Sequence, residues 1–221
     1  MAVSPRGARR ASDLDRVDAA LDVLVGALDR QIERFRIGAV RSEEDLTSAL
    51  VATAAEALHN VVTFGVRWDA TVLTRRSEEP RHGADLLFAL DLELETYQVA
   101  KGFLTQAKCL PETRKAVADR AKLIEQCETM LRWTNAAYVW TYARRDRLRA
   151  YPAVSVVAAD GRLDDLSYLP LRDFFSDHFN CFIGDRGLGY RDTDTLEGVR
   201  REYRVGSAVL VRARADGFDE Q

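Results

Sequence analysis

The sequence predicts an α/β fold, in which a helix, three strands, a second helix and a fourth strand follow one another between residues 42 and 142. Three observations support this prediction. Apolar residues recur at helical spacing before residue 60, β-rich runs bounded by turn residues occupy much of residues 61–108, and an almost continuous apolar run covers residues 136–142. This alternation of helical and strand patterns is typical of a sheet that is covered by helices.

The composition is that of a globular protein with a sizeable core. Of the 221 residues, 47% are hydrophobic and 30% are charged. No apolar run approaches the roughly 18 residues of a transmembrane helix, so we expect no membrane association. Residues 1–10 are basic but lack the apolar segment of a secretory signal.

The cysteines and the net charge narrow the functional classes. Cys109, Cys127 and Cys181 are odd in number and form no C-x-x-C pair, which argues against a disulfide framework and a zinc knuckle and favours a reducing cytoplasm. The net charge of −3 gives no global attraction to nucleic acid. Arginines cluster at residues 144–149 and 200–204, and either cluster alone is more typical of a solvated surface.

The first part of the chain predicts a flexible basic tail over residues 1–11 and an amphipathic helix within residues 12–41. Ser12 suits the N-cap, and acidic residues follow it in the first turn. The helix carries an apolar stripe at 3–4 spacing, made of Leu14, Val17, Leu21, Leu24, Leu28, Ile32 and Phe35. We expect this stripe to pack on its own domain, and homodimerisation through it is the alternative.

A second helix is predicted from Ser42 to about residue 60, with Glu43 and Glu44 in its first turn and Asp45 at the capping-box position. Glu44 and Glu56 both lie on this helix. They are twelve residues apart in the sequence, which is about 18 Å along a helix. Both carboxylates therefore cannot serve the same site.

The strands of the predicted core follow this helix. Residues 61–64 and 70–74 form either one bent strand or a hairpin around Gly65. Residues 83–108 supply the next two strands, with a turn near residues 95–100. After Pro111 we expect a helix over about residues 112–133, and then a central strand over residues 136–142 that is buried on both faces.

Residues 143–221 are expected to form an irregular α/β extension of the same domain. Their patterns predict a strand over residues 154–158, helices near residues 171–182 and 195–202, and a last strand over residues 208–212. The glycines of residues 184–189 lack the lysine of a P-loop and do not join a strand to a helix in the way that motif requires, so we do not interpret them as a phosphate site.

Three polar side chains of residues 83–108 are placed to converge. Asp85 enters the first of the two strands, and Gln106 and Lys108 end the second. Because side chains alternate along a strand, Gln106 and Lys108 share one face while Ala107 points to the other. Taken singly, Asp85 is typical of a turn at a strand entry and Lys108 of a solvated strand end. Their joint placement suits metal-dependent attack on a phosphodiester.

This arrangement resembles the PD-(D/E)xK nuclease superfamily, in particular the branch that includes the Mrr-type restriction endonucleases and carries Gly-x-Asp and Gln-x-Lys. The matching residues are Gly83-Ala84-Asp85 and Gln106-Ala107-Lys108, and the resemblance covers residues 42–142. It implies a restriction-endonuclease-like mixed sheet with the order αβββαβ. Gln106 stands in place of the superfamily's usual second acid, the span from Asp85 to Gln106 is long, and no proline precedes Asp85.

The resemblance implies a divalent-metal-dependent endonuclease that hydrolyses phosphodiester bonds in DNA, in restriction or antiviral defence. The metal would be Mg²⁺, with Mn²⁺ as a substitute, and the loss of one carboxylate favours a single ion. Its implied ligands are the Asp85 carboxylate, the Gln106 amide oxygen, the Ala107 main-chain carbonyl and the carboxylate of Glu44, with Glu56 as the alternative.

Lys108 would orient or deprotonate the attacking water and offset the charge of the transition state, as the resemblance implies. His82 and Gln126 are weaker candidates for the same site. Because no sequence-reading module is recognisable, target choice would depend on a partner protein or on oligomerisation. The alternative function is a catalytically inactive nuclease-fold adaptor or nucleic-acid-binding subunit of a larger complex.

Overall fold

In a computed structural model, which describes residues 11–37, 43–74, 83–110, 119–143 and 146–215, the described strands form one mixed sheet. The side chains of residues 43–45, 143 and 146 are outside this description. In spatial order the strands are β1 (Val61–Thr63), β2 (Val66–Thr74), β8 (Ser207–Ala215), β3 (Leu86–Glu93), β4 (Gln98–Cys109), β5 (Ala137–Ala143), β6 (Asp146–Pro152) and β7 (Leu169–Pro170). Neighbours are antiparallel except for the pairs β8–β3 and β4–β5, which are parallel.

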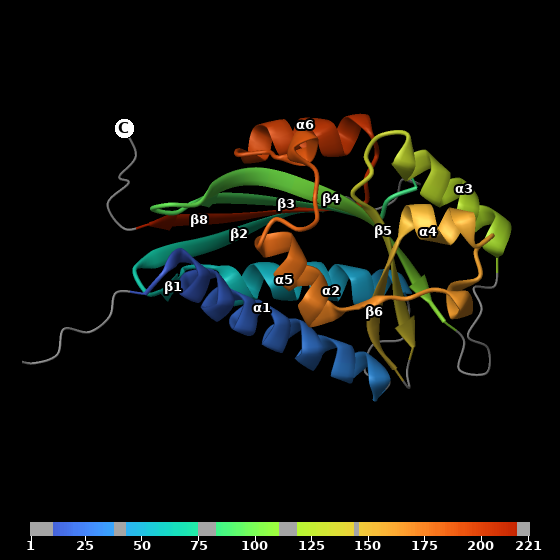
Figure 1. Ribbon diagram of the computed structural model, residues 1–221, viewed down its shortest axis with the longest axis horizontal. Helices are drawn as coiled ribbons and strands as arrows, with labels where there is room; N and C mark the ends of the chain where they lie inside the picture. The colour runs from blue at the N-terminus through green and yellow to red at the C-terminus, as the bar shows by residue number, and fades with distance from the viewer. Residues whose placement is uncertain (1–10, 38–42, 75–82, 111–118, 144–145, 216–221) are drawn as a thin grey trace, which may run out of the picture.

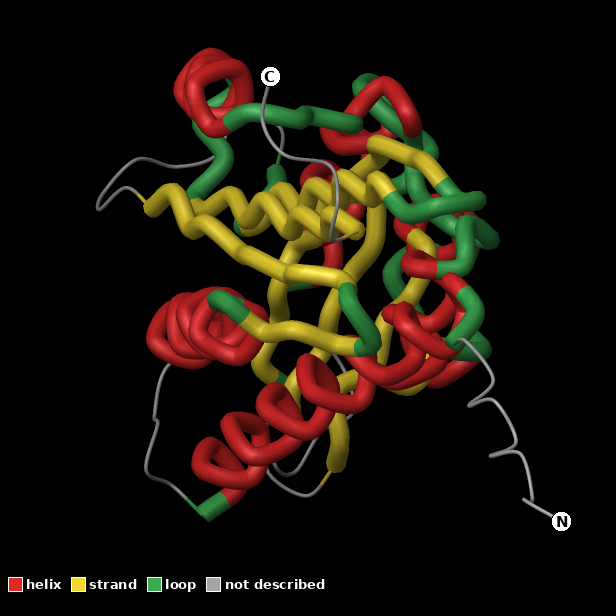
Figure 2. The backbone as a smooth tube through the Cα atoms, turned by 90° about the vertical axis from the view of Figure 1, so that its left-hand side faces the viewer, coloured by secondary structure: helices red, strands yellow, loops and turns green. Residues whose placement is uncertain are grey.

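Helices cover both faces of the sheet and separate two cores (Figures 1 and 2). The first face carries α1 (Asp13–Arg36), α2 (Glu43–Leu58) and α5 (Leu171–Phe179), and the second carries α3 (Arg120–Leu131), α4 (Ala153–Ala158) and α6 (Thr193–Glu202). Two short 3₁₀ helices, η1 (Leu163–Asp165) and η2 (Arg186–Leu188), complete the described elements. This confirms the α/β class. Within the described parts of the chain, no helix has the length and apolar character needed to cross a membrane.

The N-terminal helix begins and packs as its sequence predicts. The Ser12 hydroxyl accepts a hydrogen bond from the Asp15 main-chain N–H, and the Asp15 carboxylate accepts one from the Ser12 N–H, which completes a capping box. Six of the seven stripe residues are buried, and Leu14 alone is exposed. The buried stripe contributes to the core of the first face together with α2 and α5. These side chains therefore pack within their own domain.

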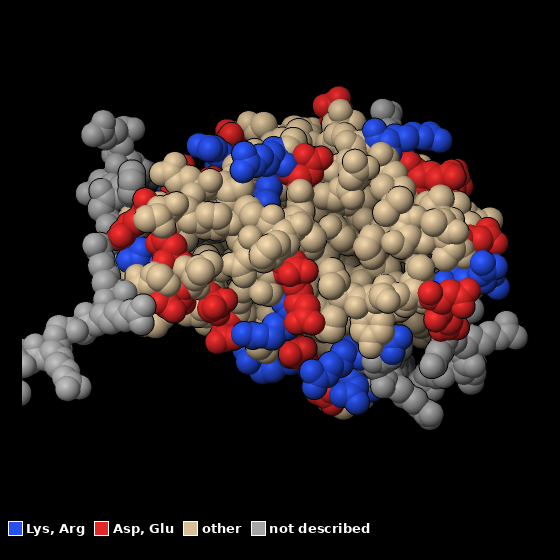
Figure 3. All heavy atoms as spheres, viewed as in Figure 1, with Lys and Arg blue, Asp and Glu red and all other residues tan. Residues whose placement is uncertain are grey.

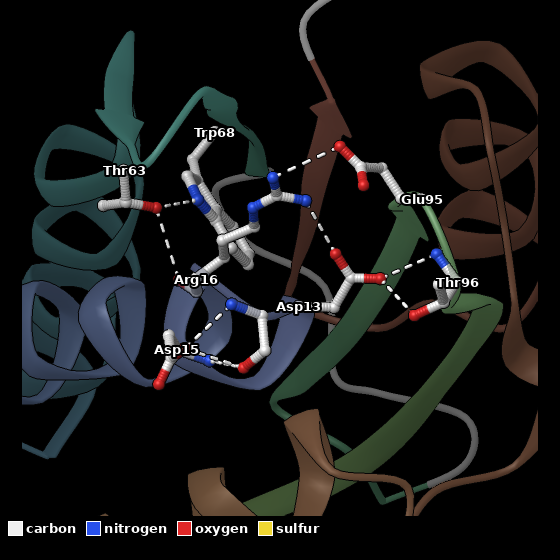
Figure 4. A network of polar contacts seen from close by, with 8 residues as sticks. Asp13, Asp15, Arg16, Thr63, Trp68, Glu95 and Thr96 are labelled. Atoms are coloured by element: carbon white, nitrogen blue, oxygen red, sulfur yellow. Dashed lines mark hydrogen bonds and ion pairs between the residues drawn. The ribbon is translucent and has the colours of Figure 1, made fainter. Parts of the chain in front are cut away.

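A polar network ties the start of α1 to two turns of the sheet (Figure 4). Asp13 accepts hydrogen bonds from the main-chain N–H and the hydroxyl of Thr96, each at 2.7 Å. The Arg16 guanidinium bridges Asp13 at 2.8 Å and Glu95 at 3.3 Å. Thr63 donates to the Arg16 carbonyl and accepts from the Trp68 indole at 2.7 Å. The network fixes the position of α1 on the β3–β4 turn and the β1–β2 hairpin.

Asp13→Asn is expected to destabilise the protein more at neutral pH than in acid. Burial raises the pKa of Asp13, but the hydrogen bonds from Thr96 and Arg16 outweigh this effect and hold the pKa below its usual value. The stabilisation is therefore complete above the unfolded-state pKa and is lost as the pH falls through the lowered folded-state pKa. We expect a loss of about 1–2 kcal/mol at pH 7 and a smaller one near pH 3, measured by urea unfolding. The exposed Asp18→Asn on the same helix is the control, and an equal loss at both pH values would contradict the prediction.

The hairpin alternative for residues 61–74 is confirmed. Thr63 pairs with Val66, so Phe64 and Gly65 form a two-residue turn between β1 and β2. Both turn residues have positive φ, +48° for Phe64 and +76° for Gly65. That combination is the signature of a type I′ turn, which matches the twist of a hairpin.

The prediction that residues 154–158 form a strand is wrong, because Ala153–Ala158 form α4. The run of β-branched residues favours a strand by local propensity. However, Pro152 occupies the N-cap, and the buried residues Ala153 and Val156 are three apart, which is helical spacing. Packing against α3 and β5 in the second core decides the conformation. Arg147 and Arg149 of the arginine cluster lie in strand β6, directly before α4.

The C-terminal part of the chain contributes a central strand to the sheet, in addition to the predicted extension. The predicted last strand forms as β8, but it lies in the middle of the sheet between β2 and β3. Its residues Val209, Val211 and Ala213 face the first core, and Ala208 and Leu210 face the second. The three strands that follow α2 in the chain are therefore not three neighbours in space, and the core is completed only when residues 207–215 are in place.

Candidate functional site

Asp85 lies directly before β3, at the centre of one end of the sheet. Its main-chain N–H donates to the Thr105 carbonyl at 2.9 Å, and its carbonyl accepts from the Ser207 N–H at 2.9 Å. The backbone of Asp85 is thus held by β4 on one side and β8 on the other. Because both neighbours are buried strands, the side chain leaves from a fixed point.

The predicted alternation along the end of β4 is confirmed. Phe103 and Ala107 belong to the core of the first face, whereas Leu104 belongs to the core of the second. Gln106 and Lys108 share the parity of Leu104 and therefore belong to the α3 face. Gln106 is buried and Lys108 is half-buried, as expected where a strand emerges from the core.

The structure brings together three of the residues that the sequence predicts. One carboxylate oxygen of Asp85, Oδ2, accepts hydrogen bonds from Gln106 Nε2 at 2.5 Å and from the Ala107 main-chain N–H at 2.8 Å. Gln106 Nε2 also donates to the Ala107 carbonyl at 3.1 Å. The amide N–H₂ group of Gln106 therefore bridges two oxygen atoms, the Asp85 carboxylate and the Ala107 carbonyl.

The opposite end of the Gln106 amide has no such partner. Gln106 Oε1 is buried and accepts no hydrogen bond from the described residues, and the same holds for Gln126 Oε1 on α3. A buried oxygen without a donor costs free energy, about 1–3 kcal/mol. Such atoms are commonly paired with water or a cation.

Helix α3 crosses directly over the segment that carries Asp85. A Cβ atom on Gly83 would lie 2.7 Å from the Cα and the carbonyl oxygen of Gln126, and Gly83 itself has a φ of +69°. Only glycine suits both the backbone conformation and this close approach. The close packing brings Gln126 next to the Asp85 segment, and sequence reasoning gave this residue little weight because a helix amide is usually a surface group.

Lys108 extends toward the same helix. Among the described residues it makes no hydrogen bond and no ion pair, and its charge acts on Cys127 of α3. Burial raises the pKa of the Cys127 thiol to about 12, with Lys108 opposing the rise and Glu128 adding to it. Lys108 therefore places a cationic group, without a carboxylate partner in the part of the chain that the structure describes, on the face that carries Gln106.

The structure does not place the helix carboxylate that the resemblance implies. The side chain of Glu44 lies outside the described residues, as does His82. Helix α2 packs on the face opposite to Gln106. Its first half approaches the Asp85 end of the sheet, because Leu50 and Leu86 line the same apolar cavity.

Glu56, the alternative, is exposed near the other end of α2. Three residues further on, His59 Nδ1 lies 2.9 Å from the Asp69 carboxylate, and Asp69 pairs with Arg212 of β8. Arg212 lies five residues along β8 from Ser207, which is about 16 Å from the Asp85 end. Glu56 is therefore remote from Asp85.

The donor set at Asp85 suits a hard cation in type. Asp85, the Ala107 carbonyl and the unpartnered Gln106 Oε1 offer three oxygen donors, the ligand type that Mg²⁺ prefers. The Gln106 N–H₂ group already donates to the Asp85 carboxylate and to the Ala107 carbonyl. If the Gln106 amide were turned end for end, Oε1 would lie beside these two oxygens in place of the N–H₂ group. Across the described ranges, no three His, Cys, Asp or Glu side chains are grouped as a metal cluster. The site therefore holds one carboxylate with amide and main-chain oxygens.

The start of β8 is a part of this site that sequence reasoning missed. Ser207 holds the Asp85 carbonyl, and a Cβ on Gly206 would lie 3.0 Å from that oxygen. No local signal points to this contact, because more than a hundred residues separate the two segments.

Comparison with protein family models, curated proteins and solved structures gave no match to the chain.

Proposed function

We propose that the protein is a divalent-metal-dependent endonuclease that hydrolyses phosphodiester bonds in DNA. One observation supports this proposal above the others. The Asp85 carboxylate, the Gln106 amide and the Ala107 carbonyl meet where β3 begins and β4 ends, with the cation of Lys108 on the same face as Gln106. These are the residues, from the two strands, that the PD-(D/E)xK resemblance implies.

Asp85, Gln106 and Ala107 would hold the cation through oxygen atoms. When bound, Mg²⁺ polarises a phosphate and makes a water molecule a better nucleophile. Lys108 offers a positive charge and hydrogen-bond donors to the negative charge that develops on the phosphate. Its half-buried position makes that charge worth more than it would be in bulk water.

DNA as the substrate and a role in restriction or antiviral defence come from the resemblance. The charge distribution supports dependence on a partner protein for target choice. On the face seen in Figure 3, acidic and basic groups are interspersed, and the described residues there form no continuous basic surface. Arg200 and Arg201 are both paired with Glu197, at 2.6 Å and 2.5 Å. This arginine cluster is thus partly neutralised within the chain.

The second candidate is a catalytically inactive adaptor with the same fold. It is favoured by one contact, the hydrogen bond from the Ala107 N–H to Asp85. β3 begins at Leu86, opposite Thr105, so Ala107 lies beyond the first residue of β3. The Asp85 carboxylate therefore also caps a main-chain donor that would otherwise lack a partner on this side. A purely structural Asp85 would make the same contact.

A plasmid-cleavage assay distinguishes the two candidates. Purified protein with Mg²⁺ or Mn²⁺ is expected to cleave supercoiled DNA, and Lys108→Ala and Asp85→Ala are each expected to lower the rate on the order of 10²–10³-fold. Lys122→Ala, an exposed lysine on α3, is the matched control and should cleave like the wild type. Equal residual cleavage in all four proteins would identify a contaminant and exclude the enzyme.

A further inference from the structure

An apolar cavity lies in the first core, between the sheet and the three helices that cover this face (Figure 1). Its walls come from both layers: Leu28 of α1, Leu50 of α2 and Leu171 of α5 on the helix side, and Leu86 of β3 and Val209 of β8 on the sheet side. The empty volume is about 310 Å³, part of which is open to solvent. This size is at the lower end of the range for small-molecule sites.

Two short side chains of α2 leave this space open. Val51 and Ala54 both line the cavity, and because they are three residues apart they lie on the same side of the helix. They are 2% and 4% exposed, so the cavity reaches into the packed core. Protein interiors contain few voids larger than a water molecule. A leucine at position 54 would extend into the cavity, so the size of these side chains sets its volume.

The chemistry of the lining favours an uncharged, apolar occupant. Among the described residues that line the cavity, none has a charged, hydroxyl or amide side chain. The one polar side-chain atom is Nε1 of Trp140, which is buried and has no acceptor in the described part of the chain. An ordered water needs about two to four polar partners, which this lining does not supply. Dry cavities of this kind bind small apolar molecules such as benzene.

Three aromatic side chains of the wall suit an aromatic ligand. Phe175 of α5 packs at an interplanar angle of 63° against both Trp140 and Phe88, with ring centroids 6.0 Å and 5.5 Å apart. All three residues line the cavity. Aromatic rings prefer edge-to-face and offset contacts over a parallel sandwich. A ring bound among these three side chains would add contacts of the same kind.

We propose that this cavity is a binding site for an uncharged molecule with a single aromatic ring. The cavity lies on the face of the sheet opposite to α3, so the inference does not depend on the proposed nuclease activity. It nevertheless backs onto the Asp85 segment, because Leu86 follows Asp85 and Trp140 pairs with Ala107 in the sheet. A ligand in the cavity contacts these strands from behind, without entering the site at Asp85.

Toluene binding, measured by titration calorimetry and by the melting temperature of the full chain, tests the proposal. We expect a dissociation constant on the order of 0.1–1 mM. The melting temperature should rise with toluene concentration, because a ligand that binds only the folded state stabilises it. Benzoate, which has a carboxylate in place of the methyl group, should not bind, since the lining offers no partner for a buried charge. Absence of toluene binding, or equally tight benzoate binding, would overturn the proposal.

The indole N–H signals of the three tryptophans locate the ligand. In ¹H–¹⁵N spectra, toluene should shift the Trp140 signal, which Trp140→Phe assigns. The Trp133 signal should stay in place, because Trp133 stacks on Tyr203 in the second core, with ring centroids 3.8 Å apart. Equal shifts of both signals would show non-specific binding and contradict the assigned site.

A cavity-filling variant separates this site from any other. Ala54→Leu should weaken toluene binding about ten-fold or more, because the added side chain takes the place of the ligand. Ala52→Leu is the matched control, the same change at an exposed position of α2, and should bind toluene like the wild type. Unchanged affinity in a folded Ala54→Leu protein would overturn the proposal. If circular dichroism shows that Ala54→Leu does not fold, the Trp140 signal of the wild type decides, and the proposal fails if toluene does not shift it.

Discussion

Asp85→Asn is expected to reduce metal-dependent DNA cleavage on the order of 10²–10³-fold while leaving the fold almost as stable as the wild type. Asparagine keeps an oxygen that can accept a hydrogen bond from the Ala107 N–H, so this main-chain donor of β4 stays capped. Its amide N–H₂ would face Gln106, which can turn its own amide end for end and accept through Oε1. Only the negative charge, the main electrostatic ligand for a divalent cation, is removed.

Three measurements test this substitution: plasmid cleavage with Mg²⁺, Mg²⁺ binding by calorimetry, and urea unfolding. We expect cleavage and Mg²⁺ binding to be lost together and the free energy of unfolding to change by less than about 1 kcal/mol. Asp69→Asn is the matched control, because Asp69 pairs with Arg212 toward the other end of the sheet. Full cleavage by Asp85→Asn would show that this carboxylate acts only as a cap, as in the adaptor.

Gly83→Ala adds one methyl group and is expected to destabilise the protein strongly. A φ of +69° costs an alanine about 1–2 kcal/mol. In addition, the new methyl group would lie 2.7 Å from main-chain atoms of Gln126, so α3 must move away from the sheet. We expect a combined loss of about 3 kcal/mol or more, comparable to overpacking a core, together with a loss of activity because the Asp85 segment shifts.

Gly198→Ala is the matched control with the opposite sign. Gly198 lies within α6, and no atom lies within 4 Å of the position that its Cβ would occupy. Alanine should therefore stabilise the protein by about 0.5–1 kcal/mol. Urea unfolding of both variants measures the difference. A Gly83→Ala protein as stable as the wild type would contradict the close packing of α3 on this segment.

The sequence predicted those features that depend on neighbouring residues. The capping box of Ser12 and Asp15 and the buried stripe of α1 follow from spacing along one helix. The shared face of Gln106 and Lys108 follows from the period of two along a strand. The convergence of Asp85 with Gln106 was also predictable, because the two strands are joined by a short turn and pair antiparallel.

Other parts of the fold could not be predicted locally. Residues 153–158 have the composition of a strand and form α4, because Pro152 and the second core favour a helix there. Gln126 was a minor candidate until the packing of α3 on Gly83 placed it beside the Asp85 segment. The hydrogen bonds from Tyr97 to Cys181 and from Lys101 to the Ile183 carbonyl join residues about eighty positions apart, without any motif.

The sequence by itself thus determined the α/β class, the start of α1 and the local geometry of Asp85, Gln106, Ala107 and Lys108. Hydrophobic periodicity, helix caps and turn residues act over a few neighbouring positions. The features named above depend only on such local patterns. Only the tertiary structure decided that β8 lies between β2 and β3 and that Ser207 holds the Asp85 carbonyl. Pairing between distant strands depends on which apolar faces the whole chain must bury, and no local pattern records that choice.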